Sequence, residues 1–529
     1  MSFATVSSIA GHQAAKAGGE FRALNPATGQ TIEPAFSSAT RDDVDRAARA
    51  AYAAFLVWRK RSGRERAQLL RAIADGLDAA TAEIVARAQQ ETALPEARLQ
   101  GETKRTSGQC RHFADVVEEG SWVGARIDKA MPDRKPLPRP DIRSVLQPLG
   151  PIAVFGASNF PLAYSVAGGD TASALAAGNS VVVKAHPAHP GTSAIVARII
   201  VESIRSCGAP DGVFSMLFDS GFDVGQALVQ HPLIQAVGFT GSRNGGRALM
   251  DLAAQRPHPI PCFAEMGSTN PVFILPGALQ QQGNQLATGL FGSFTLGAGQ
   301  FCTKPGMVFL PTQAETTPLL EELRRLTAES GAFTLLTPGI AANYKRSLQS
   351  RRSETGLTLR EAKDATGTCA VSAALLETGI DEFLAHPAWS DEVFGPTSLV
   401  IRYQQREAIL RAAEELEGHL TASVWGTAAD LAEYADLIAI LERKAGRLIF
   451  NGFPTGLEVS DAIVHGGPYP AASDSRFTAV GSRAILRFAR PVCYQGFPDA
   501  SLPDELRDAN PVGILRMIDG NTTREAVSG

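Results

Sequence analysis

The sequence lacks the features that mark zinc- or disulfide-stabilised, nucleic-acid-binding and membrane-spanning proteins. Its 529 residues include only 6 cysteines, with no CxxC pair and no Cys/His spacing typical of a zinc site. The formal net charge is -4 and no long Lys/Arg run occurs, so nothing supports a nucleic-acid surface. No stretch reaches the roughly 20 apolar residues of a spanning helix, and the N-terminus has no basic segment before an apolar one. We therefore expect a cytoplasmic protein with no metal, no nucleic-acid partner and no membrane span.

What is present is the composition of an ordinary globular protein, with 44% hydrophobic and 20% charged residues, 50 Gly and 32 Pro. The length exceeds that of a usual single hydrophobic core, which predicts two or more folded units. Such a size favours an enzyme with a cleft.

Periodicity along the chain predicts an α/β fold. Residues 21–29 are typical of a strand and turn, and residues 41–102 are rich in Ala, Glu and Arg with helical spacing. Residues 129–140, rich in Pro and charge, predict an extended connection. From 145 to 270, short β-branched runs alternate with small-residue helices, as in a parallel sheet with crossover helices.

A second alternating region runs from 271 to about 450, with helices expected over 315–330 and 406–417. After a loop rich in Gly, Pro and Ser, residues 484–497 (AILRFARPVCYQGF) are strand-like. A terminal strand of this kind can pair with the sheet edge of another subunit.

The strongest chemical signal is Cys302 in the small-residue segment GSFTLGAGQFCTKPG. Small neighbours let backbone amides approach the atom that the sulfur attacks, as an oxyanion site requires. A lone cysteine is more often a buried core residue. The nucleophile interpretation therefore depends on the motifs that accompany Cys302.

Two polar residues at expected strand ends are candidates to assist that cysteine. Glu265, in FAEMGSTNP, follows an apolar strand and can serve as a general base, although most single Glu residues are simply solvated. Asn159, in VFGASNFPL, follows another strand and precedes an expected helix that begins at the proline. Its amide can donate to an oxyanion together with the Cys302 N–H, whereas an Asn in such a turn is more often a helix cap.

A weaker signal suggests a nucleotide site. The strand IQAVGFT leads into Gly241, Ser242 and Gly246 at the expected start of a helix, where a phosphate can bind. The spacing is not GxGxxG. Lys184, at the end of the strand SVVVKAHP, can reach ribose hydroxyls, although a Lys at a strand end is more often solvated.

Five segments in order, GASNFP, FTGS, FAEMGSTNP, GAGQFC and EVFGP, resemble the aldehyde dehydrogenase superfamily. The resemblance covers nearly the whole chain. It implies a Rossmann-like cofactor domain (21–128 and 148–266), an α/β catalytic domain (267–450), oligomerisation segments (129–147 and 480–500) and a C-terminal tail (501–529). It also implies a homodimer or homotetramer.

The resemblance implies a role for each site residue. Cys302 is the nucleophile that forms a thiohemiacetal and then a thioester, Glu265 activates the hydrolytic water, and Asn159 holds the oxyanion. Glu392 and Phe394 position the nicotinamide ribose. The adenosine and pyrophosphate groups are assigned to Lys184, Gly241, Ser242 and Gly246.

One departure from the common pattern concerns the cofactor. Many NAD-preferring members have an acidic residue three positions after the strand-end lysine, and this chain has Pro187 there. Losing that carboxylate removes repulsion toward a 2′-phosphate, so we expect NADP to be accepted and preferred over NAD. His186 and Thr192 are candidate phosphate donors, although a His or Thr in a turn is more often structural.

The strings KAHPAHPGTS, EMGSTNP and HGGPYPAASDSRFTAVG resemble the 2,5-dioxovalerate (α-ketoglutaric semialdehyde) dehydrogenase branch, which is similar to NADP-dependent fatty aldehyde dehydrogenases. This resemblance favours oxidation of 2,5-dioxopentanoate to 2-oxoglutarate. Because that substrate carries a carboxylate, a cation should face the substrate tunnel. Candidates for the substrate site, each equally able to be a surface or core residue, are Arg105, Arg111, Arg476, Phe160 and Phe453.

Three alternatives remain at this stage. A medium- or long-chain aldehyde dehydrogenase would have an apolar tunnel without an Arg anchor. A catalytically silent member with a binding or structural role would not need Cys302, Glu265 and Asn159 together. An enzyme that passes its thioester to phosphate or coenzyme A would not need a base such as Glu265 for hydrolysis.

Overall fold

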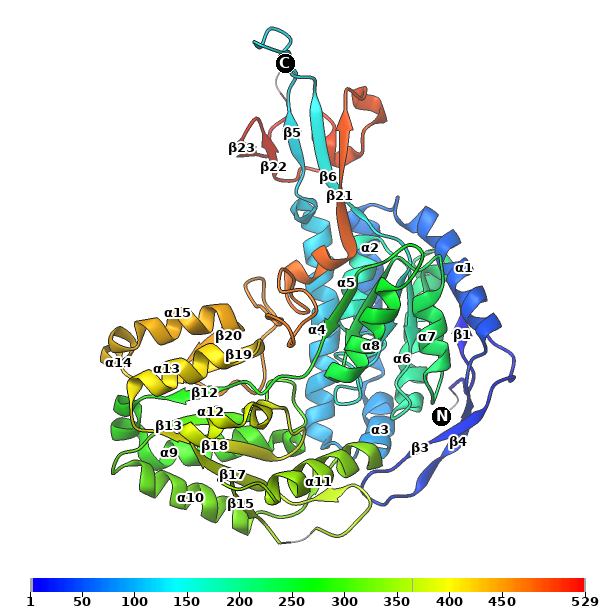
Figure 1. Cartoon of the computed structure of the whole chain (residues 1–529). Coiled ribbons are helices and arrows are strands. Elements are labelled where there is room, and N and C mark those ends of the chain that lie inside the picture. The colour runs from blue at the N-terminus through cyan, green and yellow to red at the C-terminus, as the bar shows by residue number, and fades with distance from the viewer. Residues whose placement is uncertain (1–2, 364, 528–529) are drawn as a thin grey trace.

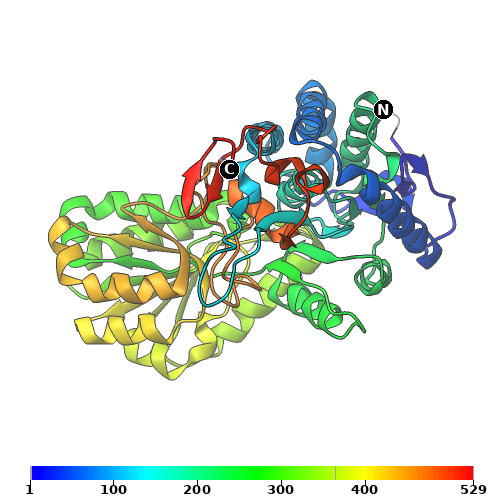
Figure 2. The same cartoon turned by 90° about the horizontal axis from the view of Figure 1, so that it is seen from above.

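The computed structural model describes residues 3–363 and 365–527, and over these residues it confirms the predicted α/β class. The strands of the described residues form two seven-stranded sheets, one five-stranded sheet and two separate strand pairs. Figure 1 shows the two large sheets in the body of the molecule and the five-stranded sheet projecting from it as an arm. Seen from above, the two large sheets with their helices occupy opposite sides of the body (Figure 2).

The first large sheet has the order β11-β10-β7-β8-β9-β1-β2 and is parallel from β11 to β9. Its parallel strands are connected by the helices α5 (Gly169–Ala177), α6 (Pro190–Ser206), α7 (Asp223–Gln230) and α8 (Arg243–Ala254). Both faces are covered, so the strands are almost continuously apolar. The strands are β1 (Ser8–Ile9), β2 (His12–Gln13), β7 (Ile152–Phe155), β8 (Val181–Lys184), β9 (Phe214–Leu217), β10 (Ala236–Thr240) and β11 (Cys262–Glu265).

The second large sheet has the order β15-β17-β18-β13-β12-β19-β20, and only β15 runs antiparallel to its neighbour. Its strands are β12 (Val272–Ile274), β13 (Met307–Pro311), β15 (Thr358–Glu361), β17 (Ala374–Gly379), β18 (Thr397–Tyr403), β19 (His419–Trp425) and β20 (Ala445–Phe450). The helices of this region are α9 (Pro276–Thr295), α10 (Thr316–Glu329), α11 (Pro338–Arg352), α12 (Ile380–Ala385), α13 (Arg406–Glu415), α14 (Ala428–Glu433) and α15 (Ala435–Lys444). The helices expected over 315–330 and 406–417 are thus confirmed as α10 and α13.

The helical front end is also confirmed. It consists of α1 (Arg41–Trp58), α2 (Gly63–Ala79), α3 (Thr81–Thr92) and α4 (Glu96–Glu119), after the strand pair β3 (Glu20–Leu24) and β4 (Thr31–Ser37). Thr40 and Ser62 begin α1 and α2 with capping boxes, because each hydroxyl accepts from a backbone N–H that the helix leaves unpaired. Helix α4 continues well past residue 102 and contacts both α2 and α5.

The arm is a five-stranded sheet of order β21-β6-β5-β22-β23. Its strands are β5 (Arg126–Asp128), β6 (Ile142–Pro148), β21 (Ala489–Gln495), β22 (Arg516–Ile518) and β23 (Asn521–Thr523). Residues 129–140 form the exposed connection between β5 and β6, as expected for an extended segment. Strand β21 pairs along its length with β6 of the same chain and lies at the edge of the sheet. Residues 501–529, expected to be a tail, contribute β22 and β23.

The strand expected over residues 484–497 is too long. Residues Ser482–Phe488 form a 3₁₀ helix, and only Ala489–Gln495 forms the strand β21. The cause is tertiary: Arg487 is buried and forms an ion pair with Asp170 of α5 at 2.8 Å, and Phe488 is fully buried. These contacts hold the segment against α5.

The helix expected to begin at the proline after Asn159 is also wrong. Residues 161–168 form successive turns, and α5 begins only at Gly169. The fully buried carboxylate of Glu102 accepts from the backbone N–H groups of Leu162 and Ala163 at 2.9 and 3.0 Å. Helix α4 thereby fixes the segment that follows Asn159.

Over the described residues, no helix combines the length and the apolar character needed to cross a membrane.

Candidate active site

Cys302 lies in the connection between α9 and β13, on a tightly turned backbone. Gly297, Ala298 and Gly299 all have positive φ, the region that favours glycine. A Cβ on Gly299 would come within 2.1 Å of the carbonyl oxygen of Gly395, which belongs to the EVFGP segment. Glycine therefore allows the nucleophile segment and the EVFGP segment to approach each other closely.

The amide of Asn270 holds the backbone on the other side of Cys302. Its Nδ2 donates to the carbonyl oxygens of Cys302 and Lys304 at 2.8 and 2.9 Å, and its Oδ1 accepts from Ser268 and Thr421 at 3.0 Å. Asn270 is fully buried. A buried side chain with its polar atoms paired in this way is a rigid support for the nucleophile.

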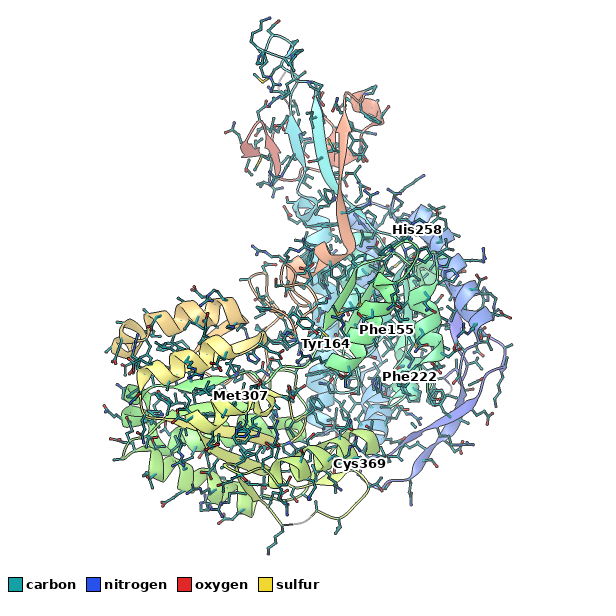
Figure 3. The ribbon with its side chains drawn as sticks, in the orientation of Figure 1. Phe155, Tyr164, Phe222, His258, Met307 and Cys369 are labelled. Atoms are coloured by element: carbon teal, nitrogen blue, oxygen red, sulfur yellow. The ribbon has the colours of Figure 1, made fainter. Side chains whose placement is uncertain are left out.

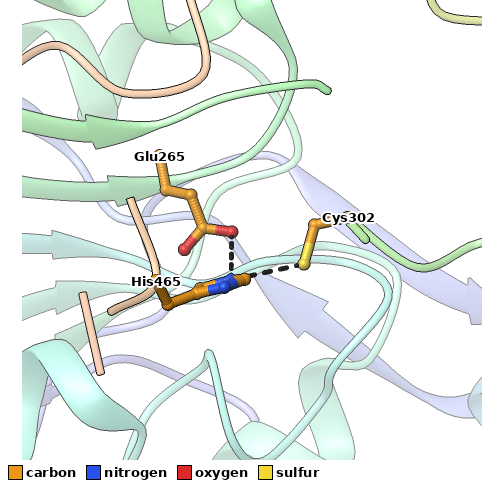
Figure 4. Close-up of side chains that lie close together, drawn as sticks. All are labelled: Glu265, Cys302 and His465. Carbon is orange, nitrogen blue, oxygen red and sulfur yellow. Dashed lines mark hydrogen bonds and ion pairs between the residues drawn. The ribbon is translucent and has the colours of Figure 1, made fainter. Parts of the chain in front are cut away.

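Three side chains from distant parts of the sequence meet at the sulfur (Figure 4). The Sγ of Cys302 lies 3.5 Å from the Nε2 of His465, and the same nitrogen lies 2.9 Å from the Oε1 of Glu265. Glu265 ends β11, as its sequence predicted, and is 4% exposed, whereas His465 is 1% exposed. The imidazole thus lies between the thiol and the carboxylate.

His465 begins the string HGGPYP and was not among the expected site residues. The loop that begins there runs beside β11: Glu265 forms an isolated bridge with Ala472, and the N–H of Met266 donates to the carbonyl of Ala471 at 2.8 Å. The backbone N–H of His465 donates to Thr478 Oγ1 at 2.8 Å. A histidine beginning a Gly/Pro-rich loop was a usable signal, but nothing in the sequence indicated that this loop passes the nucleophile.

The environment of Cys302 favours the neutral thiol. Burial raises the pKa of the thiol well above its usual value, and the nearby carboxylate of Glu265 raises it further, while Arg105 opposes the shift. A neutral thiol is a weak nucleophile, so an adjacent base must take its proton. The Nε2 of His465 is the nitrogen in position to do so.

Within the part of the chain that the structure describes, one group of three side chains could hold a metal ion. It is this same group, because the ligand atoms of Glu265, Cys302 and His465 all lie within 4.8 Å of one another. A metal on Sγ would occupy the electron pair that a nucleophile needs. The arrangement is therefore better suited to moving protons at the sulfur than to retaining an ion.

Asn159 lies beside the nucleophile segment, where its Nδ2 donates to the carbonyl of Gln300 at 3.0 Å. The carbonyl of Asn159 in turn accepts from Arg98 at 2.7 Å. An amide nitrogen carries two protons, so one remains for an oxyanion near Cys302.

Three residues were expected near the adenosine. Lys184 ends β8 as expected, and burial lowers its pKa despite the opposing charge of Asp219. Burial lowers the pKa of His186 well below its usual value, so this ring is neutral. Thr192 donates its hydroxyl and its N–H to the buried carboxylate of Glu91, both at 2.8 Å, and is thereby occupied.

The expected phosphate region has the predicted strand–turn–helix form. Ser242 caps α8, with its hydroxyl accepting from the N–H of Gly245 at 3.2 Å. A Cβ on Gly241 would meet the Phe239 ring at 2.6 Å, and one on Gly246 would meet Met266 at 2.7 Å. Glycine at these two positions lets the helix start pack directly on β10 and the residue after β11.

Glu392 is half-buried next to Gly267, and a Cβ on Gly267 would come within 2.2 Å of the Oε2 of Glu392. Burial raises the pKa of Glu392, while Lys304 opposes the shift. Lys304 is itself buried and donates to the carbonyls of Val393 and Thr397 at 2.8 and 3.0 Å. The segment that carries Glu392 and the half-buried Phe394 is thus tied to the residue two positions after Cys302.

The five candidate substrate residues lie in different places. Arg105 and Phe160 are close to the nucleophile: Arg105 donates to Tyr164 Oη at 2.9 Å, and Phe160 packs edge-on against Phe301, the neighbour of Cys302. Arg111 and Arg476 form ion pairs with surface carboxylates and lie outside this cluster. Phe453 packs on Trp425 and would contact a Cβ on Gly289, which places it against α9 and β19.

Comparison with known proteins gives three findings. The model of the aldehyde dehydrogenase family matches residues 13–468. The chain is 49% identical to alpha-ketoglutaric semialdehyde dehydrogenase 2 of Azospirillum brasilense, over 97% of this chain and 98% of that one, and 47% identical to alpha-ketoglutaric semialdehyde dehydrogenase of Acinetobacter baylyi, over 92% and 93%. The crystal structure of gamma-glutamyl-gamma-aminobutyraldehyde dehydrogenase from Burkholderia cenocepacia has the same fold, with a TM-score of 0.79 at 22% identity, covering 94% of this chain and 97% of that one.

Proposed function

The chain belongs to the aldehyde dehydrogenase family, and on this premise we propose that it oxidises the semialdehyde 2,5-dioxopentanoate to 2-oxoglutarate, with NADP as preferred cofactor, through a thioester on Cys302. The observation that carries the chemistry is the contact of one histidine nitrogen with both the thiol and the Glu265 carboxylate. The two relatives named for this semialdehyde support the substrate.

Acylation begins with proton transfer from the thiol. In the tautomer of His465 with its proton on Nδ1, the free electron pair of Nε2 takes the proton from Sγ, and the Sγ electron pair forms a bond to the aldehyde carbon. The carbonyl π electrons move to the oxygen, where the amide of Asn159 and the N–H of Cys302 stabilise the oxyanion. Glu265 holds the resulting imidazolium through its Oε1. The product of this step is a thiohemiacetal.

When bound, a nicotinamide cofactor would supply the hydride acceptor that oxidises the thiohemiacetal to the thioester. The chain fits such a group: Gly241 and Gly246 keep Cβ atoms out of the helix start, and the carboxylate of Glu392 would accept from ribose hydroxyls. The Glu265 carboxylate then takes a proton from the water that attacks the thioester. Sγ leaves as a thiolate and regains its proton from His465.

The test of the proposed function is a comparison of substrates. We expect kcat/KM for 2,5-dioxopentanoate to exceed that for every unbranched neutral aldehyde from propanal to dodecanal by roughly 10²-fold, because a carboxylate–guanidinium contact adds a charge-assisted interaction. The readout is cofactor reduction at 340 nm. Activity that rises with chain length would instead identify a fatty aldehyde enzyme, and inactivity toward all aldehydes with retained NADP binding would identify a silent member.

The NADP preference is supported by Lys184 and by the absence of a carboxylate at Pro187. We expect Pro187→Glu to lower kcat/KM for NADP by at least roughly 10-fold relative to NAD, because the new carboxylate repels the 2′-phosphate. Pro187→Gln is the matched control, since it has the same size without the charge. An unchanged NADP/NAD ratio in Pro187→Glu, or the same loss in Pro187→Gln, would contradict this assignment.

A further inference from the structure

The space next to the nucleophile is apolar, yet cationic side chains reach it. The apolar cluster here includes Phe160, Tyr164 and Val480, with Phe301, Leu457, Val459 and Ile463 packed against it. Arg105 of α4 stacks on this cluster, and Arg447 of β20 binds the loop that carries Leu457 of the cluster. Tyr164, labelled inside the body of the molecule in Figure 3, is 8% exposed.

Two side chains, Tyr164 and His465, link Arg105 to the reacting sulfur. Its Nη2 donates to Tyr164 Oη at 2.9 Å, the rings of Tyr164 and His465 are 6.0 Å apart, and His465 Nε2 contacts Sγ at 3.5 Å. The guanidinium also stacks over Phe160 and Tyr164, with its carbon 5.7 and 5.2 Å from the ring centroids. These aromatic faces hold the cation in place and shield it from solvent.

Arg447 holds the loop beside the same apolar cluster. It donates to the carbonyls of Pro454 and Gly456 at 2.8 and 3.1 Å, and the next residue, Leu457, packs against the cluster. The Nε atoms of both Arg447 and Arg105 are buried without a hydrogen-bond partner. Buried donors without partners are costly, and an incoming anion would satisfy them.

Neither guanidinium has a carboxylate partner. Among residues 3–363 and 365–527, no acidic side chain lies within ion-pair distance of Arg105 or Arg447. The buried Glu102 acts on Arg105 from a greater distance and is itself committed to the backbone N–H groups of Leu162 and Ala163. Arg98, which stacks over Phe160 and Phe301, also has no ion pair among the described residues, and its Nη2 donates to the carbonyl of Asn159 at 2.7 Å.

We propose that Arg105 and Arg447 form the site that binds the substrate's carboxylate, with Arg105 as the principal cation. This inference rests on the proposed function, because that substrate brings a carboxylate to the site. In the extended five-carbon semialdehyde, the carbon bonded to Sγ and the carboxylate carbon lie about 5 Å apart. Arg105, held on Tyr164 beside His465, is the cation that we assign to this carboxylate. A substrate that ends in a neutral methyl group makes no charge-assisted contact with these guanidinium groups. The two arginines therefore determine specificity for substrates that end in a carboxylate.

The experiment compares Arg105→Met and Arg447→Met with Arg111→Met, a control on the same helix whose guanidinium pairs with Asp75 and Asp78 at the surface. The quantity is the ratio of kcat/KM for 2,5-dioxopentanoate to kcat/KM for pentanal. We expect this ratio to fall by roughly 30- to 100-fold in Arg105→Met, mainly through KM, and by less in Arg447→Met. Arg105→Lys should recover part of the loss, and Arg111→Met should keep the wild-type ratio.

A second readout needs no turnover. Glutarate, a five-carbon dicarboxylate, should protect Cys302 of the wild type from alkylation by iodoacetamide, and the concentration needed should rise at least roughly 10-fold in Arg105→Met. A wild type that prefers neutral aldehydes would refute the proposed function itself. A wild type that prefers the keto acid, with equal losses on both substrates in Arg105→Met and no loss of protection, would refute the carboxylate site alone.

Discussion

Replacing Cys302 by alanine should reduce aldehyde oxidation by roughly 10⁵-fold while leaving cofactor binding intact. The loss is large because every later step takes place on the thioester that Sγ forms. The measurement pairs the steady-state rate with an NADP titration followed by quenching of protein fluorescence. Because Asn270 holds the backbone of Cys302 through carbonyl oxygens, removing the sulfur leaves that support in place.

Cys493 provides the control for this substitution, because it is an exposed cysteine on β21 in the arm and is not one of the site residues. Cys493→Ala should keep the wild-type rate. Since burial raises the pKa of the Cys302 thiol, the thiolate fraction and hence inactivation by iodoacetamide should rise with pH through pH 9 without levelling off. A plateau near pH 7, or substantial turnover by Cys302→Ala, would show that a different group is the nucleophile.

The fold was largely predictable because its signals are local. The switch from helical spacing to short β-branched runs predicted the parallel sheet, although its first strand is β7 (Ile152–Phe155) and residue 145 lies in β6 of the arm; the two helices expected in the second region are present as α10 and α13. The errors lie where tertiary contacts override local preference. Buried Glu102 holds residues 161–168 in turns, and the Arg487–Asp170 ion pair holds Ser482–Phe488 as a 3₁₀ helix.

The site was predictable only in part, for a related reason. Glu265 and Lys184 could be placed at strand ends, because parallel strands deliver their C-terminal residues to one edge. His465 and Arg447 reach the nucleophile from segments about 150 residues further along, and no spacing in the sequence encodes that approach. Arg105, Arg111 and Arg476 were equal candidates until their partners were known.

Glu265→Gln should leave the first turnover largely intact and slow the steady state by roughly 10²- to 10⁴-fold. Acylation takes its proton to His465, which the amide oxygen of Gln can still hold through a hydrogen bond. Hydrolysis needs a base for water, and a neutral amide cannot act as one. The measurement is stopped-flow formation of NADPH, where we expect a rapid burst of about one equivalent per site followed by slow turnover.

His465→Asn is the matched comparison, because it removes the imidazole that contacts the Glu265 carboxylate. Without the imidazole, the only base left near the thiol among the described residues is the Glu265 carboxylate, so the burst should slow by roughly 10²-fold or more if His465 is the acylation base. The carboxylate of Glu265 also raises the pKa of the Cys302 thiol, so Glu265→Gln should make Cys302 react faster with iodoacetamide at pH 8 although its turnover is slower. Faster alkylation together with a preserved burst would separate the two roles, assigning Glu265 to hydrolysis and His465 to acylation. Loss of the burst in Glu265→Gln would instead mean that the carboxylate is needed for the first proton transfer, and the division of labour proposed between the two residues would be wrong.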